Sequence, residues 1–154
     1  MEYKVEEVED AITSSLLGAE VVDIRTIAIF GVLRFEDIDD SYDLLCNELS
    51  YNLGIDRVGN TNKFYSGNLF PEGYECVLTR TIFYEKDEIK NNWIITEFDE
   101  NGGKSVSEMT VNPVTPLGET VENTGAYAEF KFPLKVVGMT KWVLKGAYVN
   151  IEKQ

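Results

Sequence analysis

The stretch YECVLTRTIFYE, residues 74–85, shows the pattern that decides the fold. Apolar side chains recur at every second position, which is the spacing of a β-strand with one buried face. One charged residue, Arg80, interrupts the pattern. We therefore predict a strand in which the following side chains share one face: Tyr74, Cys76, Leu78, Ile82 and Tyr84.

The chain after residue 85 continues in short strand patterns separated by turn signals. The first is WIITEF, residues 93–98, and the second is KSVSEMTV, residues 104–111. The turn DENGG lies between them and is typical of an antiparallel hairpin. We predict two last strands at AYAEFKF, residues 126–132, and KWVLKGAYVNI, residues 141–151.

Two segments before residue 55 have helical spacing instead. An apolar stripe predicts a helix over residues 5–17, and Gly18 follows where a C-cap would stand. A second stripe predicts a helix over residues 39–53, which should end at Gly54. The fold therefore combines two short helices with a larger number of strands.

Three further segments complete the chain. Residues 20–35, EVVDIRTIAIFGVLRF, are rich in β-branched side chains and predict a largely buried strand with a bulge at Gly31. Residues 55–73 and 112–125 are rich in Gly, Asn and Pro and show little periodicity, so we predict two long loops. Loops of this length often contact ligands or partners.

These patterns predict one domain over residues 1–154. Its class should be α+β, with a mainly antiparallel β-sheet or sandwich of about six strands and two short helices, because helices and strands do not alternate through the chain. We expect the core to include the following residues: Ile38, Leu45, Leu49, Val77, Leu78, Trp142 and Leu144.

The composition excludes several functions. The chain has 14 basic and 27 acidic residues and a net charge of −13, so phosphate backbones and anionic lipid should repel it. The N-terminal residues are acidic and lack an apolar signal region, and no apolar run has the length of a membrane span. We therefore expect a chain made in a cytoplasm, without membrane or sequence-specific nucleic-acid partners, whose two cysteines are reduced and buried.

Catalytic and cofactor motifs are not found in the sequence. The chain has no histidine, which removes the commonest general base and metal ligand, and no glycine-rich nucleotide motif occurs. A carboxylate pair could hydrolyse glycosides, but 27 acids offer no way to choose two. We therefore expect a chain that is not an enzyme and has no catalytic residue, cofactor or metal.

The segment FEDIDDSYD, residues 35–43, places five carboxylates just before and within the first turn of the second predicted helix. Calcium would require a different spacing, with oxygens at alternate positions and a glycine at the turn. We interpret the run as a helix start with an exposed face, and expect Asp39, Asp40 or Ser41 to cap the helix. The following acids are interaction candidates: Glu36, Asp37, Asp39, Asp40 and Asp43.

The aromatic residues admit two interpretations. Stacking on bases, as in RNA-binding sheets, is disfavoured by the negative charge. Strand and core positions are therefore the better interpretation for the tyrosines and tryptophans of the strands. Three aromatic residues in the loop 55–73 are candidates for partner contacts: Phe64, Tyr65 and Phe70.

The last segment, MTKWVLKGAYVNIEKQ, resembles the late strand of tail tube proteins from long-tailed phages. The resemblance rests on Trp142 followed by Leu144, Lys145, Gly146, Ala147 and Tyr148, and it covers a tenth of the chain. It implies a β-sandwich core, stacked rings with an electronegative channel, and no chemistry. The chain differs from that family in its N-terminal helix and in ending soon after this strand.

Two hypotheses of function follow. The first is a structural subunit of a phage particle, in the tail tube or a tail connector, that forms rings with copies of itself and with other structural proteins of the virion. The second is an acidic immunity or inhibitor module in the cytoplasm that caps a basic protein and uses its charge to steer association. Oligomeric state separates the two, because the first requires rings and the second a one-to-one complex.

Overall fold

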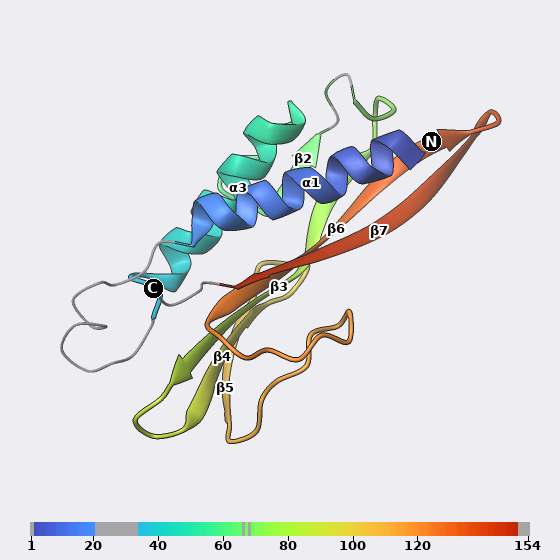
Figure 1. Cartoon of the computed structure of the whole chain (residues 1–154). Helices are drawn as coiled ribbons and strands as arrows, with labels where there is room; N and C mark the ends of the chain where they lie inside the picture. Colours follow the sequence, from blue (N-terminus) through green and yellow to red (C-terminus); the bar gives the residue numbers. More distant parts are fainter. Residues whose placement is uncertain (1, 21–33, 66, 68, 151–154) are drawn as a thin grey trace.

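The computed structural model describes residues 2–20, 34–65, 67 and 69–150. Two helices, α1 (Glu2–Ala19) and α3 (Ile38–Leu53), pack against each other and against one face of an antiparallel sheet (Figure 1). The predicted α+β class is thereby confirmed. The predicted strand over residues 20–35, with its bulge at Gly31, lies almost wholly outside the described residues.

Seven strands of the described part of the chain form the sheet. They are β1 (Asp56–Arg57), β2 (Lys63–Tyr65), β3 (Glu75–Asp87), β4 (Asn92–Phe98), β5 (Lys104–Met109), β6 (Gly125–Val136) and β7 (Met139–Asn150). The hairpins β3–β4 and β4–β5 agree with the predicted turn signals, and the two predicted last strands, β6 and β7, pair with each other as a third hairpin. The short strands β1 and β2 lie in residues 55–73, so the prediction of an uninterrupted loop there was wrong.

The strand β3 is the centre of the sheet. It pairs with β2 over residues 75–77, with β6 over residues 77–80 and with β4 over residues 81–87. Val77 is paired both with Lys63 of β2 and with Lys131 of β6. The strands β4 and β5 therefore extend the sheet on one side of β3, and β6 and β7 extend it on the other.

A bulge in β3 exchanges the two faces of the strand. Leu78 lies opposite Phe130, but Arg80 lies opposite Glu129, so one extra residue is inserted between them. Cys76 before the bulge therefore faces the helices, whereas Ile82 after it faces the opposite side. The prediction of a single shared face was wrong for this reason, and the interruption at Arg80 was its visible sign.

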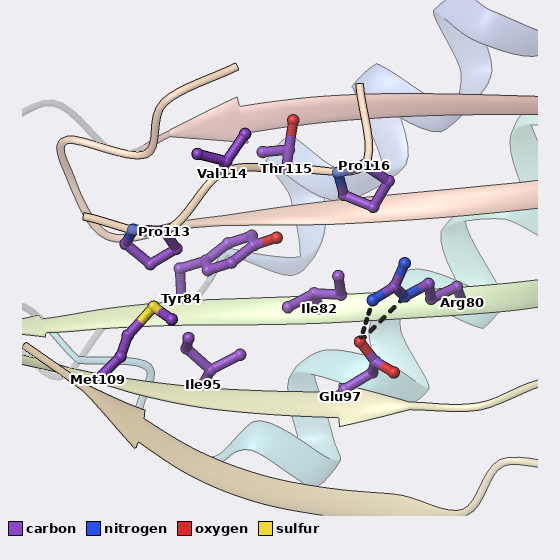
Figure 2. A pocket seen from close by; sticks show the side chains of 10 residues that line it. All are labelled: Arg80, Ile82, Tyr84, Ile95, Glu97, Met109, Pro113, Val114, Thr115 and Pro116. Atoms are coloured by element: carbon purple, nitrogen blue, oxygen red, sulfur yellow. Dashed lines mark hydrogen bonds and ion pairs between the residues drawn. The ribbon is translucent and has the colours of Figure 1, made fainter. Parts of the chain in front are cut away.

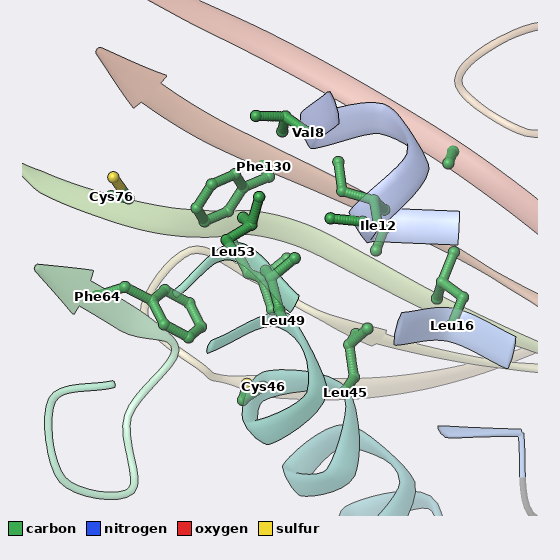
Figure 3. Close-up of a cluster of buried hydrophobic side chains, with 14 of the residues drawn as sticks. Val8, Ile12, Leu16, Leu45, Cys46, Leu49, Leu53, Phe64, Cys76 and Phe130 are labelled. Carbon is green, nitrogen blue, oxygen red and sulfur yellow. The ribbon is translucent and has the colours of Figure 1, made fainter. Parts of the chain in front are cut away.

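The main core lies between the helices and the sheet (Figure 3). Leu45, Leu49 and Leu78 are buried there, as predicted, and Ile38 and Val77 are half-buried. Trp142 and Leu144 are exposed to 43% and 55%, which makes that part of the prediction wrong. Both belong to the face of β7 that points away from the helices, and burial by period two applies only to a face that another layer covers.

The ends of the helices follow from local chemistry. Gly54 adopts a left-handed conformation (φ 64°) and caps α3, as predicted, because its N–H bonds the carbonyl groups of Ser50 and Tyr51. Gly18 is not a cap, since α1 continues to Ala19. A Cβ at Gly18 would lie 3.4 Å from Glu48 of α3, so a small residue there allows the two helices to pack closely.

The loop between β5 and β6 covers the other face of the sheet. Val121 of this loop is fully buried against a smaller cluster that includes Tyr84, Trp93 and Tyr127. The indole N–H of Trp93 donates to Asn112 at 3.2 Å, which fastens the start of the loop. The predicted loop over residues 112–125 is thus an ordered cover, and β6 begins at its last residue.

The two cysteines, Cys46 and Cys76, are free and fully buried, as predicted. Burial raises the pKa of both thiols to about 12, so they remain protonated at neutral pH. Neither helix of the described part of the chain is long and apolar enough to span a bilayer.

The position of the core is tested by a matched pair of leucines. Leu49→Ala should lower the free energy of unfolding by about 2–5 kcal/mol, because it leaves a cavity at a fully buried site. Leu144→Ala removes the same atoms from an exposed position and should change it by less than about 0.5 kcal/mol. Urea denaturation of both variants measures this, and equal losses would show that the core is misplaced.

Candidate functional site

The acidic run forms the entry to α3. The Asp37 side chain accepts hydrogen bonds from the N–H groups of Asp39 (2.9 Å) and Asp40 (3.1 Å), and Asp37 is therefore the N-cap. The predicted caps Asp39, Asp40 and Ser41 are wrong, because the helix begins at Ile38, ahead of all three. Asp37 comes directly before Ile38, which is the first apolar residue of the stripe and the first residue of α3.

Two of the five acids are held by basic residues from the sheet. Lys104 of β5 contacts both oxygens of Asp39 at 3.1 and 3.2 Å, and Arg57 of β1 contacts Asp43 at 2.6 Å. Glu36, Asp37 and Asp40 remain exposed and line an open hollow of about 440 Å³ together with Ser41 and Leu44. The run is therefore a capped helix start with an exposed acidic surface.

The described ranges contain no group of three or more acids or cysteines close enough to hold a metal ion. Three carboxylates of the run have other contacts: Asp37 accepts from backbone N–H groups, and Asp39 and Asp43 pair with basic side chains. That the run does not bind calcium in solution stays a prediction.

The three aromatic candidates of residues 55–73 have different positions. Phe64 and Phe70 lie inside the core, where their rings contact Phe130. Neither ring is available to a partner in this structure. Tyr65 is 52% exposed and is the one member of this set on the surface.

A surface that we did not predict lies on the β6–β7 hairpin. Residues 130–145 contain four lysines and no acid, a charge of +4, so the remaining residues of this chain of net charge −13 carry −17. Lys131, Lys135 and Lys141 are exposed, while Lys145 lies 3.8 Å from Glu9 of α1. The signal was visible in the sequence as a run of lysines without carboxylates, which the net charge of the whole chain conceals.

The same hairpin exposes apolar side chains. Val137 and Met139 at the turn are 98% and 72% exposed, and Trp142 and Leu144 lie on the outer face. The Trp142 ring packs edge-on against Tyr74 and beneath the Lys131 ammonium, 5.1 Å from the ring centre. We call residues 131–144, with these lysines and apolar side chains, the basic hairpin.

Figure 1 shows that the basic hairpin and the acidic run lie at opposite ends of the molecule. The hairpin turn extends beyond the start of α1, whereas the run lies at the N-terminal end of α3. A basic, apolar projection and an acidic surface therefore lie at opposite ends of one chain.

A pocket of about 230 Å³ lies on the outer face of the sheet (Figure 2). Its floor is formed by Ile82, Tyr84 and Ile95, and Pro113 and Pro116 of the covering loop form its opposite wall. Arg80, Glu97 and Thr115 add polar groups to this apolar floor and wall, so the lining is mixed.

An ion pair closes one end of this pocket. The guanidinium of Arg80 donates twice to one oxygen of Glu97, at 3.0 and 2.8 Å, and this contact raises the Arg80 pKa. Burial raises the pKa of Tyr84 to about 12, so its hydroxyl is neutral at pH 7. The lining contains neither histidine nor cysteine, and its one carboxylate is already paired.

The cap assignment predicts a difference between two substitutions at one position. Asp37→Ala should lower the free energy of unfolding by roughly 0.5–2 kcal/mol, because it removes the acceptor for two N–H groups. Asp37→Ser keeps an acceptor and should be nearly neutral. Thermal unfolding of both variants decides this, and an equal loss in the two would rule out capping as the cause.

The absence of a metal function is tested by calorimetry. Titration of the chelator-treated protein with Ca²⁺ and with Mg²⁺ should show no micromolar binding, since the carboxylates of the run lack the spacing of a calcium loop. Micromolar binding that is lost in Glu36→Gln and Asp40→Asn would overturn this interpretation.

Comparison with known proteins adds no relative: no family model, no curated protein and no solved structure matches this chain. The proposed function therefore rests on the surfaces of this chain alone.

Proposed function

We propose that this protein is a non-enzymatic structural subunit that assembles with copies of itself, head to tail, through the basic hairpin. One observation carries the proposal. A chain of net charge −13 concentrates four lysines and no acid in residues 130–145, at the end of the molecule that lies farthest from the acidic run.

The contact would combine charge and apolar burial. Lys135 and Lys141 flank the turn that exposes Val137 and Met139, so a partner that covers the turn also approaches the lysines. The exposed Glu36 and Asp40 are the matching charges at the other end of a second copy. Opposite charges steer two such ends together, and removal of the apolar turn from water stabilises the contact.

A head-to-tail contact joins two different surfaces, so it does not end with a pair. It closes into a ring when the rotation between neighbours divides a full turn, and otherwise forms a filament. This agrees with the resemblance of residues 139–154 to phage tail tube proteins, and we propose a tail tube or tail connector component of a virion as the setting. The remaining acidic surface would keep such a ring from adhering to DNA.

The acidic inhibitor remains the second candidate. It is favoured by the open hollow at Glu36, Asp37 and Asp40, which could receive a basic side chain from another protein. That function uses only the acidic end and gives no role to the basic hairpin. The head-to-tail subunit accounts for both ends and is therefore the function that we prefer.

A charge exchange between the two ends tests the proposal. One variant carries Lys131→Glu, Lys135→Glu and Lys141→Glu in the hairpin. The other carries Glu36→Lys and Asp40→Lys, which leaves the Asp37 cap and the paired Asp39 and Asp43 unchanged. Each variant alone should be unable to form head-to-tail contacts, and an equal mixture should assemble again because each reversed end meets its complement.

Light scattering after size exclusion and negative-stain electron microscopy give the readout. We expect rings or filaments for the wild-type chain and the mixture, and greater dissociation at high salt. Failure of the wild-type chain to assemble, or assembly of the hairpin variant alone, would contradict the proposal. A one-to-one complex with a basic protein, formed through the acidic end by a monomeric chain, would establish the inhibitor instead.

A further inference from the structure

The strand β5 is an open edge of the sheet. Within the described ranges it pairs with β4 alone, and five of its six residues, from Lys104 to Glu108, are exposed. A strand at such an edge presents unpaired backbone N–H and C=O groups to any strand that approaches. Val106, at the middle of β5, is 62% exposed.

The hairpin turn determines which backbone groups of β5 point outward. The Asp99 N–H donates to the Gly103 carbonyl at 2.9 Å, so this pair is hydrogen-bonded. Hydrogen-bonded and non-bonded pairs alternate along an antiparallel ladder. Ser105 and Ser107 therefore bond to β4, whereas Lys104, Val106 and Glu108 turn their backbone groups to the free edge.

We propose that two copies of this protein pair through β5, antiparallel, with Val106 on the two-fold axis. In this register Lys104 lies opposite Glu108 of the second copy, and the reverse pair occurs as well. All three outward-facing residues then meet outward-facing residues, so every hydrogen bond of the new ladder can form. The two sheets become one continuous sheet across the contact.

The side chains of β5 complement themselves in this register. The strand has one basic and one acidic residue, placed symmetrically about Val106, so the two-fold axis brings opposite charges together. Lys104 already contacts Asp39 at 3.1 Å, and its ammonium, with three donors, would lie between Asp39 and Glu108 of the second copy. Ser105 meets Ser107 on the other face. A strand with two like charges at these positions would oppose such pairing.

This contact goes beyond the head-to-tail contact of the proposed function and does not depend on it. The basic hairpin joins unlike surfaces, whereas β5 joins like surfaces and is complete with two copies. If both contacts form, two rings lie back to back. Each contact can be removed without the other, because β5 and the basic hairpin share no residue.

Crosslinking of single cysteines tests the register. Val106→Cys should form a disulfide-linked dimer under mild oxidation, because hydrogen-bonded antiparallel partners have Cα atoms about 5.5 Å apart, within disulfide range. Ser105→Cys is the matched control on the same strand. Its position lies diagonally from its own copy, beyond about 7 Å, and should not crosslink. Native Cys46 and Cys76 are fully buried and should not interfere.

Charge variants test the pairs in a second way. Lys104→Glu or Glu108→Lys alone places like charges opposite each other and should weaken the dimer roughly tenfold. The double variant, and a mixture of the two single variants, should restore it. All measurements use analytical ultracentrifugation in the Lys131→Glu, Lys135→Glu, Lys141→Glu background, with thermal unfolding as the check that each variant is folded.

The outcomes separate this inference from the proposed function. A dimer that persists in the hairpin background and is linked through Val106→Cys supports the β5 contact, even if no ring forms in the wild-type chain. A monomer up to the highest soluble concentration in that background, or equal crosslinking of Ser105→Cys and Val106→Cys, overturns it. Rings of the wild-type chain would then still support the hairpin contact.

Discussion

The bulge between Leu78 and Arg80 of β3 is the constraint on which the other parts of this fold depend. It allows a single long strand to bury one set of side chains beneath the helices and another beneath the loop of residues 112–124. Without the extra residue, Ile82 and Tyr84 would point towards the helices and Phe83 would face the covering loop. The Thr79 hydroxyl, which donates to Glu129 of β6 at 2.7 Å, fastens the strand pair at this point.

Acidic and basic side chains are also divided between different parts of the fold. Within the described residues, α1, α3 and the entry to α3 contain nine exposed acids, and the basic hairpin lies on the long β6–β7 pair. A strongly acidic chain repels itself, which keeps it soluble and lowers the stability of its compact state. The pairs Asp39–Lys104, Asp43–Arg57 and Glu9–Lys145 reduce this repulsion where helices meet strands.

Periodicity and turn chemistry were enough to predict the α+β class, both helices and the hairpins of β3, β4 and β5, because each depends on residues close in sequence. The candidate site was harder to predict from the sequence. The exposure of Trp142 and the interior positions of Phe64 and Phe70 depend on which layer covers which face, and that is set by contacts between distant segments. The basic hairpin was readable as a run of lysines, but its position opposite the acidic run required the fold.

The packing of α1 on the last two strands has a consequence for synthesis on the ribosome. Its apolar stripe, with Val8, Ile12 and Leu16 fully buried, contacts β6 and β7, which are translated more than a hundred residues later. At about 5–20 residues per second, the helix emerges several seconds before these partners exist. In that interval the stripe is a binding site for a chaperone or for other nascent chains, so nearly the whole chain must be made before this domain can close.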